Sequence, residues 1–324
     1  MMDWSDRHCR MFWRQLTEHA LLYTEMVTTG AILHAGPERF LQFHADEHPV
    51  ALQLGGSNPE DLAKCTKIAA QWGYDEVNLN CGCPSDRVQN GSFGACLMAE
   101  EQLVADCIQA MGEAADIPIT VKHRIGIDDM ESYEEMLAFI EPIKAIGCTT
   151  FIVHARKAWL QGLSPKQNRE IPPLHYDRVY RLKQDLPDVE IIINGGITDL
   201  EQSLSHMQHV DGVMLGRAAY HNPYLLADVD RLIYNKDGGT KSRDQVLMDF
   251  IPYIEEQLSQ DVPLNHITRH ILGLFQGVPG AKLFRRYISE NAHIKGAGIE
   301  VVHQAHEIMR DAQERTELFR ATSG

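Results

Sequence analysis

The sequence has 324 residues, 44% of them hydrophobic, which is enough for a barrel of about 250 residues with an appended domain. It contains no apolar run of about 18 residues and no targeting peptide at its polar N-terminus, so we expect a cytoplasmic protein without a membrane span. The formal charge of −15 argues against a general nucleic-acid binder, and seven scattered cysteines without a CxxC pair argue against a disulfide scaffold or a metal site.

Short β-rich apolar runs alternate with helical patterns through the first two thirds of the chain. The predicted strands are Leu21–Val27, Val50–Leu54, Val77–Asn80, Ile119–His123, Phe151–His154, Glu190–Asn194 and Gly212–Leu215. The predicted helices between them include Pro59–Trp72, Glu100–Ala115, Tyr133–Ile146, Tyr176–Asp185 and Leu200–His209. Strands separated by helices form a parallel sheet, and this regular spacing favours an α/β fold of the (β/α)8 TIM-barrel type over an open sheet.

The pattern supplies seven of the eight strands that a closed barrel needs. The missing strand should precede the first predicted helix, Asp6–His19, where only Met1–Trp4 stands. We therefore expect either a truncated first strand or a chain that begins downstream of its true start. In both cases the barrel is left with an unpaired edge.

The alternation of strands and helices stops after Tyr224. Residues 235–240, Asn-Lys-Asp-Gly-Gly-Thr, have the composition of a linker, and beyond them every periodic segment is helical. We therefore expect a catalytic barrel domain at 1–240 and an all-helical domain at 241–324.

A basic segment lies within the predicted helical domain, from Val262 to Ile299. Its basic residues are Arg269, Lys282, Arg285, Arg286 and Lys295. Five bases against the single acid Glu290 leave a net charge of +4. A positive segment on a negative protein favours one anionic partner bound at one place.

A helix that opens at 279–280 carries three of these bases, Lys282, Arg285 and Arg286, on one face. The apolar residues predicted for its opposite face are Leu283, Phe284, Tyr287 and Ile288. A basic face opposite an apolar face is suited to a polyanion, and a merely solvated helix face is the alternative.

Polar residues crowd the carboxyl ends of the predicted strands. They are Gln53, Asn80, Lys122 with His123, His154 with Arg156, Asn194 and Arg217. In barrels of this type the carboxyl ends of the strands form the catalytic face. The alternative is that strand ends are polar only because loops begin there.

Two glycine-containing strand ends predict a phosphate site. Asn194-Gly195-Gly196-Ile197 follows one strand, and Leu215-Gly216-Arg217 follows the next. Glycines let backbone N–H groups approach a phosphate, and Arg217 adds a charged donor. The last two loops of a barrel commonly hold a cofactor phosphate, although such glycines can also serve only as turn residues.

Lys122 and His154 end two neighbouring strands. A lysine that points into a barrel mouth is costly unless it meets an anion or an electron-rich ring, such as that of a reduced flavin. A structural ion pair and a Schiff-base lysine of an aldolase are the alternatives. Gln53 could bind the amide edge of such a ring or make a hydrogen bond within the core.

Cys83 follows the strand at Val77–Asn80 and precedes Pro84. Its neighbours Arg87, Asn90, Gly91, Ser92 and Gly94 predict a mobile loop over the mouth rather than packed core. A thiol there can act as a nucleophile or a proton donor, and a structural thiol is the alternative. Cys81 is a rival, and spacing alone does not decide between the two cysteines.

Taken together, these residues resemble the tRNA-dihydrouridine synthases. The family motif Asn-x-Gly-Cys-Pro is matched by residues 80–84, and Asn-Gly-Gly-Ile and Gly-Arg follow in the expected order. The segments that are similar to the bacterial A subfamily are Asp6–Arg10, Thr24–Gly30, His154–Trp159 and Leu274–Gly277. That subfamily is linked to uridines 20 and 20a of the tRNA D-loop, and the likeness runs from Met2 to about Met309.

The resemblance implies FMN as the cofactor and NADPH as the reductant. The residues that it assigns to FMN are Gln53, Lys122, His154, Asn194, Gly195, Gly196, Gly216 and Arg217. It assigns Cys83 as the acid that protonates C5 of the uracil while hydride goes to C6, and it frees Cys81 from that role. It implies that Asn80 and Arg156 hold the flipped-out base or its phosphate.

The helical domain is implied to clamp the tRNA, with Lys282, Arg285 and Arg286 facing it. Arg169, in the 164–169 insertion, is a further candidate for tRNA contact. The family normally has a first strand that ends in a Pro-Met pair touching the flavin. Here only Met1 and Met2 match the segment after that strand, and we expect them to touch FMN.

Two other functions stay open from the sequence. One is a tRNA-binding protein that has lost its flavin together with the first strand. The other is a flavin oxidoreductase of a free pyrimidine, similar to the dihydroorotate dehydrogenases, which does not explain the basic helical segment. In each case we expect a monomer without a metal ion.

Overall fold

The computed structural model describes residues 1–85 and 93–323, and its internal contacts divide the chain into two compact units. The first unit combines Met1–Ser5 with Leu21–Gly216, and the second combines Asp6–Ala20 with the chain from Arg217 onward. The second unit therefore begins well before residue 240 and includes an N-terminal segment. A functional division into 1–240 and 241–324 stays a prediction.

The first unit is built on one parallel sheet whose strands follow chain order. Within the described residues its strands are β1 (Leu22–Thr28), β2 (Val50–Gly55), β3 (Glu76–Cys81), β4 (Ile119–Arg124), β5 (Thr150–His154), β6 (Glu190–Asn194) and β7 (Gly212–Met214). Each strand pairs in parallel with the next one along the chain, so β1 and β7 stand at the two ends of the strand order. The predicted strands and the barrel class are confirmed, with strand ends differing by only one or two residues.

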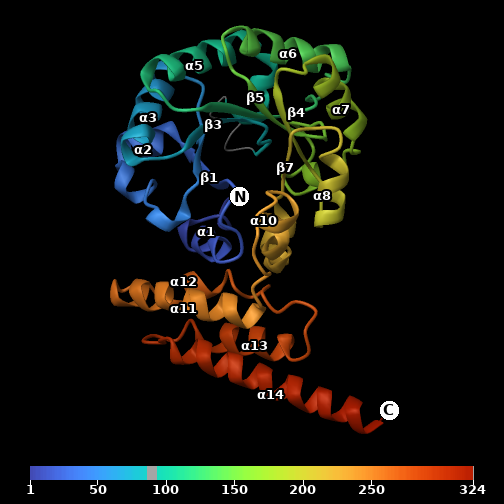
Figure 1. Cartoon of the computed structure of the whole chain (residues 1–324). Coiled ribbons are helices and arrows are strands. Elements are labelled where there is room, and N and C mark those ends of the chain that lie inside the picture. The colour runs from blue at the N-terminus through green and yellow to red at the C-terminus, as the bar shows by residue number, and fades with distance from the viewer. Residues whose placement is uncertain (86–92, 324) are drawn as a thin grey trace. The chain divides into compact units, whose positions relative to one another are not determined.

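Helices alternate with these strands and lie on the outer side of the curled sheet, as Figure 1 shows. They are α2 (Thr29–Ala35), α3 (Pro59–Trp72), α5 (Glu101–Ala114), α6 (Tyr133–Ala145), α7 (Tyr176–Asp185) and α8 (Leu200–His206). Short 3-10 helices of this unit are η1 (Pro37–Arg39), η2 (Ala45–Glu47), η3 (Gly94–Ala99) and η4 (Gln167–Arg169). The helix boundaries follow local chemistry: Asn58 caps α3 ahead of Pro59, and Ser132 forms a capping box with Glu135 at α6.

Strand β3 illustrates how alternation places the polar residues. Val77, Leu79 and Cys81 are fully buried in the hydrophobic core, whereas Asn78 and Asn80 alternate with them along the strand. Because successive side chains of a strand point to opposite faces, the amides share the face away from that core. Both faces of β3 are buried, as in a barrel with a packed interior.

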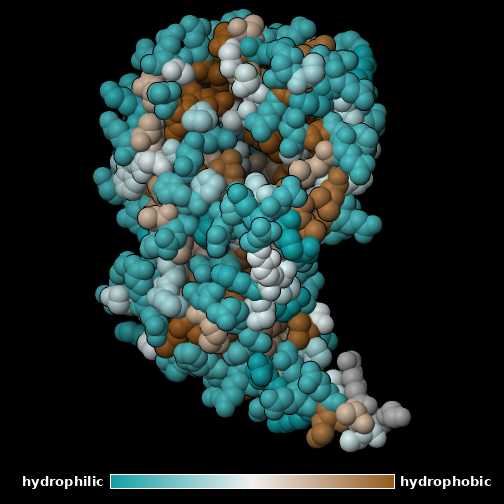
Figure 2. All heavy atoms as spheres, viewed as in Figure 1, coloured by the Kyte–Doolittle hydropathy of each residue, from teal (hydrophilic) through white to brown (hydrophobic). Residues whose placement is uncertain are grey.

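All the regular secondary structure in the described residues of the second unit is helical. Its helices are α1 (Arg7–Arg14), α9 (Arg217–His221), η5 (Pro223–Asp228), α10 (Val229–Leu232), α11 (Arg243–Ser259), α12 (Leu264–Thr268), α13 (Ala281–Asn291) and α14 (Glu300–Ser323). On α13 the predicted apolar face is confirmed for Phe284 and Ile288, which are buried, but not for Leu283, which is 43% exposed. Figure 2 shows further hydrophobic surface near the C-terminal end of the chain, where Leu318 and Phe319 are exposed.

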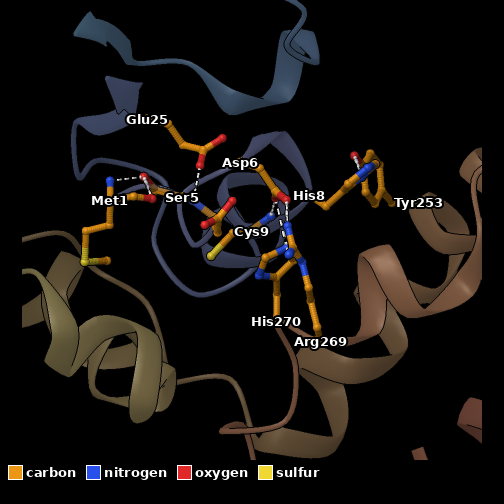
Figure 3. Close-up of polar contacts among 10 residues, drawn as sticks. Met1, Ser5, Asp6, His8, Cys9, Glu25, Tyr253, Arg269 and His270 are labelled. Carbon is orange, nitrogen blue, oxygen red and sulfur yellow. Dashed lines mark hydrogen bonds and ion pairs between the residues drawn. The ribbon is translucent and has the colours of Figure 1, made fainter. Parts of the chain in front are cut away.

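A charge cluster inside the second unit ties α1 to the segment after α12 (Figure 3). Asp6 caps α1 by accepting from the N–H of Cys9 at 2.9 Å. The same carboxylate pairs with Arg269 and, at 2.9 Å, with Nε2 of His270. His8, on α1, hydrogen-bonds the hydroxyl of Tyr253 at 2.8 Å. These contacts explain why a segment near the N-terminus belongs to the same compact unit as residues near 270.

Among the helices of the described residues, none is both long and apolar enough to cross a membrane.

Candidate functional site

Five of the polar side chains predicted at the strand ends gather at one end of the sheet. Asn80 of β3 lies opposite Lys122 of β4, and His154 of β5 lies opposite Asn194 of β6 in the strand register. Gln53 of β2 joins them through a hydrogen bond of 2.9 Å from the Asn80 amide. Parallel strands bring their carboxyl ends to the same edge, so these five residues line the mouth of the barrel.

The turn that carries Cys83 is held by the Asn80 side chain. Oδ1 of Asn80 accepts from the N–H groups of Gly82 and Cys83 at 3.0 and 2.9 Å. The carbonyl of Cys83 accepts from the N–H of Ala95 at 2.9 Å, which fixes the other side of the turn. The half-buried Cys83 thiol lies 3.5 Å from the hydroxyl of Ser85, so it is positioned by its backbone and remains accessible.

The structure separates the two cysteines that spacing leaves unresolved. Cys81 is the last residue of β3, is 0% exposed and packs in the hydrophobic core. Burial raises the pKa of its thiol well above the usual range. Cys83 lies beyond the end of the strand, so the alternation that places Cys81 no longer applies to it. Of this pair, Cys83 is the thiol that a ligand at the mouth can reach.

Arg124, at the end of β4, supports the same turn and is absent from the sequence-based candidates. Its buried guanidinium donates from Nε to the carbonyl of Gly82 at 2.8 Å. Its NH1 donates to the carbonyls of Lys157 and Asn168 at 3.1 Å each. Burial lowers the pKa of Arg124 to about 10. Only its place directly after two other polar residues at a strand end could have identified it from the sequence.

Lys122 contributes a positive charge without a carboxylate partner among the described residues. Its Nζ donates to Oδ1 of Asn194 at 3.3 Å, and Asn194 is oriented by donating from Nδ2 to the carbonyl of Met214 at 2.7 Å. Burial, reinforced by Arg124, lowers the pKa of Lys122 to about 8, while a charge on the Cys83 sulfur acts in the opposite direction. A lysine in this setting is stabilised by any anion that binds at the mouth.

His154 is a neutral group within this positive region. Burial, followed by the charges of Arg124, Lys122, Arg156 and Arg169, holds its pKa well below the usual range. Four cations are therefore close enough to act on one imidazole. A neutral imidazole can accept or donate a hydrogen bond, and it adds no further charge to the site.

Gly195 and Gly196 form a cradle that no larger residue could replace. Both have positive φ, 117° and 72°, and a Cβ on Gly195 would lie 2.5 Å from the His154 ring. A Cβ on Gly196 would lie 2.6 Å from Leu174. Their N–H groups have no hydrogen-bond acceptor in the described part of the chain, and Tyr176 holds the Gly195 carbonyl at 2.7 Å. Open N–H groups on bare backbone suit an anionic ligand such as a phosphate.

Arg156 and Arg169 belong to the loop that follows β5. Arg156 donates to the carbonyls of Glu170 and Pro172. Arg169 is exposed in η4, next to the buried Asn168, whose side chain binds both backbone groups of Trp159 at 2.8 Å. The loop that follows β5 is therefore held by these hydrogen bonds and carries two arginines.

The remaining candidates are spread more widely. The sulfur of Met1 lies within 3.7 Å of the Cβ position of Gly216, whereas Met2 is 60% exposed. Arg217 begins α9 in the second unit. The predicted loop residues Arg87, Asn90, Gly91 and Ser92 lie outside the described residues, and Gly94 is buried at the start of η3.

The basic face predicted in the helical part lies on α13 of the second unit. Lys282 is exposed and Arg285 is partly exposed. Arg286 donates to Glu290 at 2.8 Å, so the one acid of the basic segment neutralises one of these three bases. Lys282 and Arg285 therefore carry more of the available positive charge than Arg286 does.

The mouth of the barrel thus combines an accessible thiol, clustered cations and an open glycine cradle. These features suit an anionic ligand bound beside a group that can donate a proton. No set of three or more metal-ligating side chains is found among residues 1–85 and 93–323.

Comparisons with known proteins show which family this chain resembles. A family model described as dihydrouridine synthase (Dus) matches residues 1–312. Three curated proteins called tRNA-dihydrouridine(20/20a) synthase are similar to most of the chain. The protein of Shewanella oneidensis is 63% identical over 307 residues, which is 95% of this chain and 91% of its own length. Those of Vibrio vulnificus and Escherichia coli K12 are 61% and 59% identical, over 94% and 96% of this chain and 94% and 90% of their own lengths.

A solved structure of a 2-naphthoyl-CoA reductase complex shares the fold, with a TM-score of 0.52. It is 9% identical, and the match covers 71% of this chain and 47% of that chain. This likeness concerns the fold alone.

Proposed function

The chain belongs to the dihydrouridine synthase family, and from that premise we propose that it reduces uridines 20 and 20a in the D-loop of tRNA to dihydrouridine. The observation that carries the proposal is identity of about 60% to tRNA-dihydrouridine(20/20a) synthases over nearly the whole chain. The geometry of the mouth supports it, because an accessible thiol stands among cations that suit an anionic cofactor and substrate.

We propose FMN as the cofactor, since the residues at the mouth fit its chemistry. Its phosphate suits the open N–H groups of Gly195 and Gly196, with Gly216 and Arg217 as further contacts. Its ring suits Lys122, whose charge lacks a carboxylate partner in the described chain. The other residues assigned to FMN are Gln53, His154, Asn194, Met1 and Met2. Bound and reduced, the flavin supplies the hydride that goes to C6 of the uracil ring.

The proton that completes the reduction of the uracil ring comes from a side chain of the protein. Addition of hydride at C6 leaves negative charge on C5 and the neighbouring carbonyl, and this charge is removed when a proton adds to C5. Cys83 is the donor, because its thiol is accessible at the mouth and lies on the turn that the Asn80 side chain holds. Loss of the proton leaves a thiolate, and a proton from water restores the thiol.

The tRNA is held by separate groups of residues. Asn80 and Arg156 bind the uridine that has left its stack, and Arg169 adds a contact from the insertion. The tRNA backbone is bound by α13 through Lys282, Arg285 and Arg286. Positive side chains bind the phosphates of RNA whatever its base sequence. We propose NADPH as the reductant of the reaction. We also propose that the enzyme would act in the cytoplasm as a monomer and without a metal ion.

The direct experiment supplies the purified protein with FMN, NADPH and unmodified tRNA, followed by mapping of dihydrouridine by mass spectrometry. We expect dihydrouridine at positions 20 and 20a and nowhere else. Formation at other positions would refute the site assignment. Retained tRNA binding without dihydrouridine would favour a binding protein, and equal turnover of free uracil would favour a free-pyrimidine oxidoreductase.

A further inference from the structure

A continuous line of polar side chains runs through the interior of the barrel, away from the mouth. Its upper part begins at the Cys83 turn, where Oδ1 of Asn80 accepts from two backbone N–H groups. Asn80 then donates from Nδ2 to Oε1 of Gln53 at 2.9 Å. Gln53 donates in turn from Nε2 to Oδ1 of Asn78 at 3.0 Å. Three amides are thus linked head to tail.

The lower part of the line ends on a carboxylate. Asn78 donates from Nδ2 to the hydroxyl of Thr120 at 2.8 Å, and Thr120 donates to Oε1 of Glu76 at 2.6 Å. The same oxygen accepts from the hydroxyl of Tyr23 at 2.5 Å. Glu76, Asn78 and Thr120 are 9%, 0% and 3% exposed, so little water competes for these bonds.

Every donor in the line points the same way, from the Cys83 turn toward Glu76. The direction is set at both ends. The backbone N–H groups at the top can only donate, so Asn80 must turn its oxygen toward them. Oε1 of Glu76 accepts from Thr120, which leaves a lone pair of the Thr120 hydroxyl free to accept from Asn78. An amide turned the other way would leave donors facing donors in a buried place.

Glu76 has no role in the chemistry described above, and it has no basic partner among the residues that the structure describes. Burial raises the pKa of its carboxyl group, while the hydrogen bonds from Thr120 and Tyr23 counteract burial. An unpaired buried carboxyl group is costly, so its presence at the base of the line calls for a role that apolar packing would not fulfil.

We propose that Glu76 is a positioning residue: it accepts the last hydrogen bond of the line and so fixes the Cys83 turn and the Gln53 amide in one orientation. The inference rests on the proposed function for what Cys83 and Gln53 do, but not for how they are held. Glu76 lies several hydrogen bonds from the mouth, so its effect reaches the reacting groups only through Thr120 and the amides.

The test breaks the line in its middle and at its base, each time with a matched control. Thr120→Val removes the hydroxyl at nearly constant volume, and Thr120→Ser keeps it. Glu76→Leu removes the acceptor, and Glu76→Gln keeps an oxygen that both hydroxyls can reach. We expect Thr120→Val and Glu76→Leu to lower kcat roughly tenfold, with KM for tRNA within about twofold of wild type. Both controls should stay close to wild type.

A second readout needs neither cofactor nor tRNA: the rate at which iodoacetamide alkylates Cys83, followed by peptide mass spectrometry in FMN-free protein. The held turn fixes the position of the sulfur at the mouth, and the rate of alkylation depends on how the sulfur is presented to the reagent. We expect alkylation to slow about threefold or more in Thr120→Val and Glu76→Leu but not in their controls. A merely structural role would lower the melting temperature and leave both rates unchanged at temperatures where the variants are folded.

The inference is overturned if folded Thr120→Val matches Thr120→Ser in both kcat and alkylation rate. This pair also decides the matter if Glu76→Leu fails to fold. If wild-type protein forms no dihydrouridine, the proposed function fails, and the alkylation rates still show whether the line holds the Cys83 turn.

Discussion

The mouth of the barrel and the Asp6 cluster of the second unit both contain basic side chains, but among the described residues a carboxylate pairs with those of the Asp6 cluster and not with Lys122 at the mouth. At Asp6, one carboxylate is matched by Arg269, His270 and the N–H of Cys9. Burial alone would raise the pKa of Asp6, yet these partners together bring it far below the usual range. At the mouth, Lys122 meets only an amide oxygen among the described residues, and burial lowers its pKa to about 8.

This difference separates a structural cluster from a binding site. A cluster whose charges compensate one another contributes to stability and has little left to offer a ligand. A cluster of like charges costs stability and regains it when an anion arrives. Lys122 is therefore expected to matter for a ligand, and Asp6 for the fold.

The largest effect is expected from Cys83→Ala, which should lower kcat for dihydrouridine formation by roughly 10²- to 10⁴-fold because it removes the proton donor. FMN should still bind, since the thiol is not among the groups assigned to it. Cys81→Ala is the matched control: it should cost about 1 kcal/mol of stability in the core and leave kcat nearly unchanged. Full activity of Cys83→Ala in a tRNA assay would remove Cys83 as the acid.

The second largest effect is expected on folding stability, from a substitution in the Asp6 cluster. Asp6→Asn keeps a capping side chain but leaves Arg269 without a countercharge and the buried His270 without its carboxylate partner, so we expect a loss of roughly 2–4 kcal/mol in urea unfolding. The pKa of Asp6 is depressed in the folded state, so its contribution is complete above a pH of about 4 and declines as the pH falls below it. The unfolding free energy of Asp6→Asn should therefore depend less on pH below about 4 than that of wild type. An unfolding curve identical to that of wild type would contradict a stabilising role for Asp6.

We expect a rise in pH to act in opposite directions on two properties that depend on Lys122. It should weaken FMN binding and improve the contribution of Lys122 to folding stability. Lys122 has a folded pKa of about 8, below its ordinary value, so it loses its charge as the pH rises through 8. Affinity of the cofactor-free protein for FMN should then fall up to about tenfold between pH 7 and 9. The contribution of Lys122 to stability should instead improve over that range and up to its unfolded pKa. In fluorescence titrations, Lys122→Met should remove the pH dependence of binding; a slope equal to that of wild type would rule Lys122 out.

The smallest effect distinguishes two bases on α13. Lys282 is exposed, whereas Arg286 is paired with Glu290. Lys282→Ala should weaken tRNA binding several-fold and reduce the salt dependence by about one ion, because a phosphate contact is lost. Arg286→Ala should have the lesser effect, because Glu290 already engages this guanidinium and leaves it less available to a phosphate. Equal effects of the two substitutions on filter binding would count against the pairing as the deciding factor.

The fold could be predicted from the sequence because its signals are local. Apolar runs such as Val50–Leu54 and Glu190–Asn194 lie between helical segments at regular spacing, and the structure forms strands there. The boundary between the compact units could not be predicted, because it depends on a contact between Asp6 and residues 269–270, more than 260 positions away. Periodicity in the sequence near the N-terminus cannot predict a contact with residues so far away in the chain.

Only part of the candidate site could be predicted from the sequence. Residues at strand ends were found because polar side chains interrupt apolar runs, but Cys81 and Cys83 could be separated only once the strand was seen to end between them. Arg124 was overlooked because its three carbonyl partners, Gly82, Lys157 and Asn168, lie far from it in the sequence and outside the strands. Glu76 was overlooked because a charged residue at the start of a strand normally faces solvent, whereas here it lies inside the barrel.

The most direct test of the contrast between these two regions is the shift in melting temperature that FMN causes in wild-type protein, Lys122→Met and Asp6→Asn. We expect Lys122→Met to melt no lower than wild type without FMN and to lose most of the shift. We expect Asp6→Asn to melt several degrees lower without FMN and to keep the full shift. A full FMN shift in Lys122→Met, or its loss in a folded Asp6→Asn, would contradict the assignment of the barrel mouth as the ligand site.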